Sequence, residues 1–147
     1  MKQRVIATLR RSLAERIRQT QDAIDTTRSA RDTEDRSTAG DKHEVGRAMA
    51  QIEMDRLEMQ RTQNEALLRE LERVPVERTF DRVAFGALVS TDAERYFLCI
   101  GLGRVPVDGA SVLAISPASP IGRSLLGKRV GDTIAWNGGT FRIDRIE

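Results

Sequence analysis

The first 74 residues contain no proline and no phenylalanine, tyrosine or tryptophan. All four prolines, all six aromatic residues and nine of the eleven glycines lie in residues 75–147. Proline is rare inside helices, and aromatic side chains supply much of the buried area of compact cores. This division predicts a long helical arm over residues 1–74 and a separate small domain over residues 75–147, which is just long enough to build a core.

A seam of apolar side chains, in which Thr replaces Leu toward the tip, recurs in the first 30 residues at alternating spacings of three and four. The series consists of Ile6, Leu9, Leu13, Ile17, Thr20, Ile24 and Thr27. Such spacing is the seam of a two-stranded coiled coil, and it predicts a helix from residue 2 to about residues 31–35.

A second helix is predicted from about residue 41 to about residue 72. Two apolar stripes of this helix could face the first helix, and the sequence is compatible with both. One stripe contains Ile52, Met59 and Ala66, and the other contains Met54, Leu57, Leu68 and Leu71. Either stripe would give an antiparallel pair of helices.

Residues 32–46 separate the two helices. Ser37 and Thr38 favour caps and turns, and Gly40 would cost about 1 kcal/mol inside a helix, so a bend is expected here. The bend is rich in carboxylates, which are Asp32, Glu34, Asp35, Asp41 and Glu44. The first three and the single histidine, His43, are interpreted as solvent-exposed. We therefore expect a helical hairpin with acids at its tip.

The second half changes to the short period and turn residues of a sheet. Strands are predicted at residues 83–89, 95–100, 105–107, 111–115, 133–136 and 140–146, with a short helix at about residues 121–126. Turns are expected at residues 90–92, at Asp108-Gly109 and at Asn137-Gly138. Pro106 cannot donate to a ladder and predicts an edge strand. The fold class is α+β, an antiparallel helical hairpin followed by a small, mainly antiparallel β domain with one short helix.

Charge and composition narrow the possible partners. Each half of the chain has a net charge of +1, but residues 1–18 are basic and residues 19–46 are acidic. This asymmetry favours a protein partner, or one that carries a metal, over nucleic acid alone. The single cysteine, Cys99, excludes an internal disulfide and is expected in the core. With no apolar run of about 20 residues and a charged N-terminus, we expect neither membrane insertion nor secretion and a cytoplasmic location.

Residues 119–132 read Ser-Pro-Ile-Gly-Arg-Ser-Leu-Leu-Gly-Lys-Arg-Val-Gly-Asp. This run closely resembles the signature Ser-Pro-Leu-Gly-x-Ala-Leu-Leu-Gly-Lys-x-Val-Gly-Asp of the C-terminal domain of Gre-type bacterial transcript cleavage factors. The resemblance implies an N-terminal coiled coil, an FKBP-like C-terminal domain and bacterial RNA polymerase as the partner. It also implies only indirect contact with RNA and DNA, and we expect a monomer.

The resemblance implies roles for two groups of residues. Ser119, Pro120, Ile121 and Gly122 would dock at the rim of the polymerase secondary channel. The family's tip reads Gly-Asp-Leu-Lys-Glu-Asn-Ala-Glu-Tyr, and residues 40–48 read Gly-Asp-Lys-His-Glu-Val-Gly-Arg-Ala. Asp41 and Glu44 match the family's acids, which help to hold a Mg²⁺ ion shared with the polymerase. Without the resemblance, this pair is interpreted as a helix cap and a first-turn acid favoured by the helix dipole.

Three functions remain open at this point. The chain could stimulate cleavage of backtracked transcripts, acting as an accessory factor with no catalytic activity or cofactor of its own. It could occupy the channel without cleavage, because the Asn, the second Glu and the Tyr of the family's tip are absent. It could also be a coiled-coil scaffold. A prolyl isomerase is excluded because six aromatic residues are too few for both a core and an aromatic-lined pocket.

Overall fold

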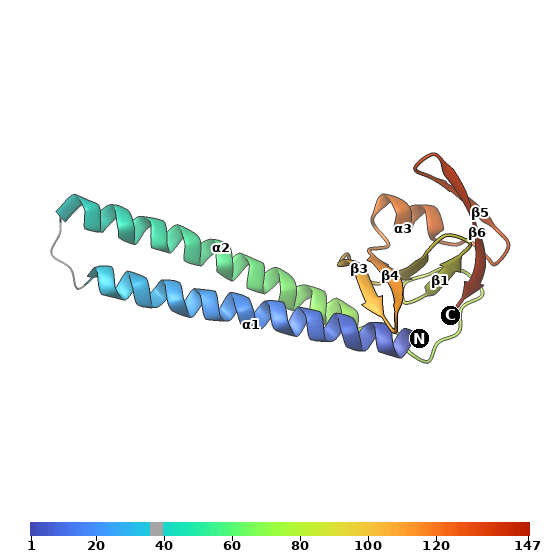
Figure 1. Cartoon of the computed structure of the whole chain (residues 1–147), viewed down its shortest axis with the longest axis horizontal. Coiled ribbons are helices and arrows are strands. Elements are labelled where there is room, and N and C mark those ends of the chain that lie inside the picture. The colour runs from blue at the N-terminus through green and yellow to red at the C-terminus, as the bar shows by residue number, and fades with distance from the viewer. Residues whose placement is uncertain (36–39) are drawn as a thin grey trace. The chain divides into compact units, whose positions relative to one another are not determined.

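The structure, a computed structural model, describes residues 1–35 and 40–147, with the side chains of residues 1–33 and 44–147 (Figure 1). Two long helices come first, α1 (Lys2–Asp35) and α2 (Gly40–Glu72). They are followed by β1 (Leu88–Thr91), β2 (Arg95–Leu98), β3 (Gly103–Val107), β4 (Ala110–Ile115), α3 (Pro120–Leu125), β5 (Thr133–Trp136) and β6 (Gly139–Ile146). The predicted fold class is confirmed.

The chain forms two compact units that differ from the two predicted segments. One unit is Ser12–Leu68, and the other combines Met1–Arg11 with Arg69–Glu147. The second unit therefore contains the whole sheet, the first turns of α1 and the last turn of α2. The domain boundary after residue 74 stays a prediction.

The two long helices form an antiparallel hairpin. Among the described residues, three pairs of side chains form hydrogen bonds between them. Arg10 donates to Glu72 through Nε (2.8 Å) and Nη2 (3.2 Å), Arg61 Nη1 donates to Gln21 Oε1 (2.5 Å), and Arg31 Nη1 donates to Gln51 Oε1 (3.1 Å). In each pair the two residue numbers add up to 82, so a single register holds along the hairpin.

Burial shows which stripes form the seam. From α1, the predicted Ile6, Leu9, Leu13, Thr20 and Ile24 are buried, and Ile17 and Thr27 are half-buried. From α2, the buried side chains are Met54, Leu57 and Leu71. The alternative stripe faces solvent, with Ile52 69% and Met59 64% exposed. Of the two stripes that the sequence left open, the hairpin uses the one that contains Met54 and Leu57.

The six strands form one sheet in the order β3-β4-β2-β1-β6-β5. Only β2 and β4 pair in parallel, because the chain passes beyond the position of β4 to make β3 and then returns. The remaining pairings are antiparallel. Pro106 lies in the edge strand β3, as predicted, where its missing N–H breaks no inner ladder.

The strand predicted over residues 83–89 is wrong for its first five residues. Gly86 has a φ of +91°, and the Ala87 N–H donates to the Ala84 carbonyl (3.0 Å), so this segment turns. A Cβ at Gly86 would lie 2.8 Å from Pro75 Cδ, which explains why glycine is required. β1 then runs on to Thr91 through the start of the predicted turn at residues 90–92.

The core lies on both faces of the sheet. On one face, Val89, Tyr96, Leu98 and Ile143 pack in a buried cluster that includes Ile121 and Leu125 of α3. The register puts Leu88, Phe97 and Ala114 side by side on the other face, where all three are buried. The same compact unit contains the buried Val5, Leu9 and Leu71 of the helices. Arg4 of α1 also pairs with Asp108 of the β3–β4 turn (2.5 Å).

Candidate functional site

The loop before α3 is held by its own hydrogen bonds. Ser119 is the N-cap, its Oγ accepting from the Gly122 N–H (3.1 Å) and donating to the Ser116 carbonyl (2.6 Å). Pro120 follows at the first helical position, where its fixed φ suits a helix start. The Ser-Pro pair therefore sits on a fixed backbone rather than on a free loop.

The four predicted docking residues are not equally accessible. Pro120 is exposed and Ser119 is half-buried, whereas Ile121 and Gly122 are buried. A Cβ at Gly122 would overlap the Ser116 carbonyl and lie 2.9 Å from Ser119 Oγ. Ile121 and Gly122 thus shape the loop from inside, and Ser119 and Pro120 are its solvent-accessible members. The docking role itself stays a prediction.

The second predicted site, Asp41 with Glu44, lies in the first turns of α2. The side chain of Asp41 lies outside the described residues, and Glu44 is exposed. Residues three apart lie on the same side of a helix, and carboxylates are suitable Mg²⁺ ligands. Among the described residues no group of three or more His, Cys, Asp or Glu could hold a metal ion. A cation at this pair would take its other ligands from elsewhere, and the metal role stays a prediction.

The sequence reasoning missed the arginines beside Glu44. A hollow of about 440 Å³ is lined by Arg31, Glu44, Arg47, Ala48 and Gln51. Arg31 reaches across the hairpin to Gln51, and it also pairs with Asp32 (3.5 Å). This end of the hairpin therefore presents guanidinium and carboxylate groups together. The spacing of three between Glu44 and Arg47 was the available signal for this arrangement.

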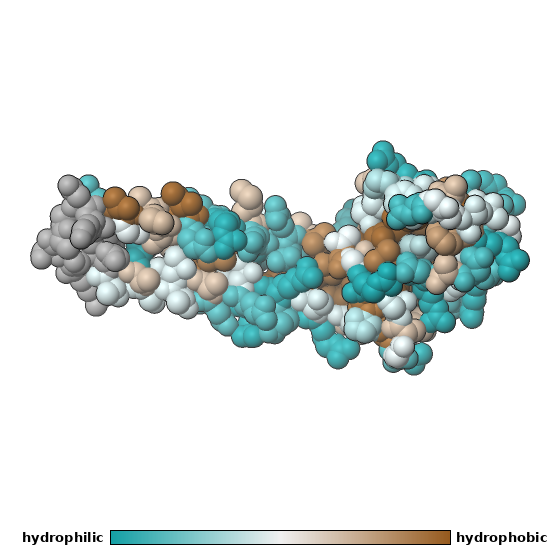
Figure 2. Space-filling model, turned by 45° about the horizontal axis from the view of Figure 1, so that its top comes forward, coloured by the Kyte–Doolittle hydropathy of each residue, from teal (hydrophilic) through white to brown (hydrophobic). Residues whose placement is uncertain are grey.

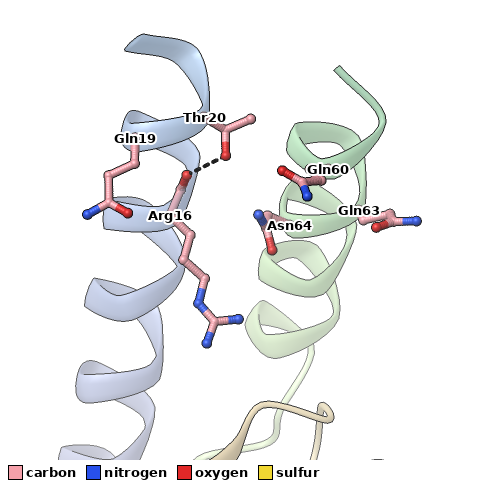
Figure 3. Close-up of a pocket in the computed structure, with 6 residues that line it drawn as sticks. All are labelled: Arg16, Gln19, Thr20, Gln60, Gln63 and Asn64. Atoms are coloured by element: carbon pink, nitrogen blue, oxygen red, sulfur yellow. Dashed lines mark hydrogen bonds between the residues drawn. The ribbon is translucent and has the colours of Figure 1, made fainter. Parts of the chain in front are cut away.

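A hollow lined by polar side chains lies farther along the hairpin (Figure 3). Arg16, Gln19 and Thr20 of α1 and Gln60, Gln63 and Asn64 of α2 line a hollow of about 320 Å³. Thr20 Oγ1 donates to the Arg16 carbonyl (2.8 Å), within its own helix. Of these side chains none is a suitable general acid or base at neutral pH. Four of the six side chains, Arg16, Gln19, Gln60 and Gln63, are exposed, so this hollow is an open part of the hairpin surface and we assign it no chemical role.

Cys99 is confirmed as a core residue. It is buried, its Sγ lies 3.8 Å from the Phe97 carbonyl oxygen, and burial raises the pKa of its thiol to about 12. A thiol acts as a nucleophile in its thiolate form. Cys99 is therefore not a candidate catalytic residue.

We predict that Cys99 is protected from alkylation in the folded protein. At pH 8, iodoacetamide should modify it at least about 100-fold more slowly than in urea-unfolded protein, because burial blocks access and disfavours the thiolate. Mass spectrometry of timed samples measures both rates. Similar rates in the two states would contradict the buried placement.

The same pKa shift predicts a loss of stability in alkali. The unfolded thiol loses its proton near the ordinary value of 9.0 and the folded thiol only near 12, so both states keep the proton at lower pH. Above pH 9 the unfolded state binds fewer protons, and the free energy of unfolding should fall by up to about 1.4 kcal/mol per pH unit. Urea midpoints at pH 8, 9 and 10 measure the slope, which should be smaller in Cys99→Ala.

The geometry first defines a class of protein. It is a two-part chain with a long antiparallel helical hairpin, acids in the first turns of its second helix, and a β domain whose short helix begins with a capped Ser-Pro pair. No described helix combines the length and the apolar character that crossing a membrane requires. The sequence profile described as "Transcription elongation factor, GreA/GreB, C-term" matches residues 78–145. Residues 78–145 therefore carry a GreA/GreB C-terminal domain, which confirms the resemblance seen in the signature at residues 119–132.

The chain was also compared with solved structures and with curated protein sequences. A solved structure, titled "Structure of the transcription factor Gfh1", aligns with 95% of this chain and 93% of that chain, at 23% identity and a TM-score of 0.38. At that level of likeness, no function passes to this chain from that structure. Comparison with curated protein sequences found no match.

Proposed function

We propose that this chain is a transcription elongation factor that binds the secondary channel of bacterial RNA polymerase and stimulates cleavage of backtracked transcripts. The observation that carries the proposal is the match of residues 78–145 to the GreA/GreB elongation factor domain. The factor acts as a monomer in the cytoplasm and touches RNA and DNA only indirectly. It is an accessory protein, and the polymerase supplies the main active site.

The β domain provides the docking part of the proposed function. Ser119 and Pro120 would contact the rim of the channel, because they are the accessible members of the signature loop. Their backbone is held by the cap and by the packing of Ile121 in the core. A preformed loop loses little conformational entropy on binding, which favours affinity.

The hairpin provides the reach. α2 has 33 residues, which at 1.5 Å per residue make a rod of roughly 50 Å. Asp41 and Glu44 lie in its first turns, at its N-terminal end. Mg²⁺ usually takes one or two protein carboxylates and fills its shell with water and phosphate. Asp41 and Glu44 would be the protein ligands that this chain lends.

A chain that supplies only part of a metal site can still affect RNA cleavage when the polymerase supplies the rest of that site. In a two-metal centre the ions stabilise the attacking and leaving oxygens of a phosphodiester. Asp41 and Glu44 would place negative oxygen atoms at that centre and would orient water there. Arg31 and Arg47, which line the same hollow as Glu44, bring positive charge beside it.

A second candidate function rests on the tip sequence. Val45, Arg47 and Ala48 stand where the Gre-type tip has Asn, Glu and Tyr. Arg47 reverses the charge of the family's second acid. This departure favours a regulator that occupies the channel without promoting cleavage.

A transcript cleavage assay on stalled complexes of bacterial RNA polymerase tests the proposal. Wild-type protein should shorten the RNA at least about tenfold faster than polymerase alone. Asp41→Asn and Glu44→Gln should each lose at least about tenfold of this stimulation while binding is retained, because each removes a charged metal ligand without changing its size. Glu58→Gln, which neutralises an acid farther along α2, is the matched control and should behave as wild type.

Each outcome assigns one function. If wild-type protein binds polymerase and gives no shortened RNA above the polymerase-only rate, the chain is the channel-occupying regulator. If a pulldown shows no binding to polymerase at all, both functions fail and a scaffold remains. Equal losses in Glu58→Gln and Glu44→Gln would refute a specific role for the tip acids.

A further inference from the structure

An exposed apolar stripe runs along α2. Among the described residues, seven large hydrophobic side chains are markedly exposed, and four of them lie on this helix while none lies on α1. They are Val45 (59% exposed), Met49 (66%), Ile52 (69%) and Met59 (64%). Figure 2 shows hydrophobic colour on the exposed surface of the helical hairpin, close to the residues drawn in grey.

The stripe occupies one face of the helix. Its members are spaced by four, three and seven residues, which keeps them on one side of a 3.6-residue turn over about 21 Å. The hairpin itself uses a different face, through Met54 and Leu57. The fold therefore does not need these four side chains to be apolar, and apolar patches that persist on a surface commonly mark interaction sites.

The stripe has an acidic border. Glu44 and Asp55 flank it on one side and Glu53 flanks it on the other, by their positions around the helix. Arg56 lies in line with the stripe, but its Nη2 pairs with Glu53 Oε1 (2.5 Å). That hydrogen bond lowers the pKa of Glu53, so this carboxylate stays ionised at neutral pH. Among the side chains that the structure describes, the border thus carries three acids against one paired base.

The acidic border favours some binding partners of the stripe over others. A second copy of the chain would bring two acidic borders together, and like charges disfavour that contact. Nucleic acid would be repelled by the same carboxylates. The border complements a protein surface whose apolar centre is flanked by Lys or Arg.

We propose that the stripe of Val45, Met49, Ile52 and Met59 is a docking surface for an apolar, basic-rimmed wall of RNA polymerase. This proposal rests on the proposed function and adds a contact along the arm to those at the signature loop and the tip. Burial of the four side chains supplies affinity through the hydrophobic effect, and the acids around them select the partner.

The test compares the affinities of full-length variants for purified bacterial RNA polymerase core enzyme. Ile52→Gln/Met59→Gln should bind at least about tenfold more weakly than wild type, because two side chains lose their apolar contact. Glutamine is a good helix former, so circular dichroism and the thermal midpoint should stay unchanged. Ile52→Leu/Met59→Leu keeps the apolar surface and is the matched control, expected within about twofold of wild type.

The possible results distinguish a failure of the stripe proposal from a failure of the proposed function. If wild type and the glutamine variant bind polymerase equally, the stripe proposal is overturned and the proposed function stands. If wild type does not bind polymerase, both are overturned. If sedimentation shows a dimer that the glutamine variant abolishes, the stripe belongs to a second copy and the polymerase contact is refuted.

Discussion

Gly122→Ala should destabilise the β domain by about 3 kcal/mol or more. The new methyl group would overlap the Ser116 carbonyl oxygen, and Pro117 Cα would lie only 3.0 Å from it. Two of these three neighbours are backbone, so no side-chain rotation can relieve the overlap. Overpacking usually costs about 1–3 kcal/mol, and a rigid backbone neighbour places this site at the upper end.

The same substitution should weaken the proposed docking. The Gly122 N–H donates to Ser119 Oγ, so a shift of Gly122 moves the capped Ser-Pro loop. Urea unfolding measures the stability, and affinity for polymerase measures the docking. Gly101→Ala is the control, since no atom lies within 4 Å of its Cβ, and it should stay within about 0.5 kcal/mol. A Gly122→Ala variant as stable as this control would show that the loop can relax.

Phe97→Ala should cost about 3–5 kcal/mol, the range for deleting a buried aromatic side chain. Phe97 is fully buried in β2 and pairs with Leu88 of β1 and Ala114 of β4. β2 is an inner strand that is hydrogen-bonded to β1 on one side and to β4 on the other, so its backbone cannot collapse into the space left behind. A cavity should remain, and the lost contacts should not be recovered.

Trp136 fluorescence during urea unfolding measures this effect in the β domain, because the only tryptophan packs against the core cluster there. Circular dichroism would be dominated by the two long helices. Leu126→Ala is the control, since Leu126 is 40% exposed, and it should cost less than about 1 kcal/mol. If Phe97→Ala also cost less than this, the pocket around Phe97 would have to close, contrary to the packing described.

Several features followed from the sequence because they depend on neighbours along the chain. The period of α1 predicted its buried seam, and Asp108-Gly109 and Asn137-Gly138 adopt the positive φ values that two-residue hairpins require. The missing N–H of Pro106 predicted an edge strand, and β3 is at the edge. The signature at residues 119–132 predicted the GreA/GreB C-terminal domain, whose family model matches residues 78–145.

Other features were decided only by contacts between distant segments. Two stripes on α2 had the helical period, and packing against α1 chose Met54 and Leu57 and left Ile52 and Met59 exposed. The start of β1 depends on Gly86 fitting against Pro75, and the burial of Ile121 depends on the core beneath α3. Local periodicity and turn chemistry thus determined which elements exist, because both act over a few residues. Tertiary packing decided which faces are covered and which residues a partner can reach, because that depends on which segments meet in space.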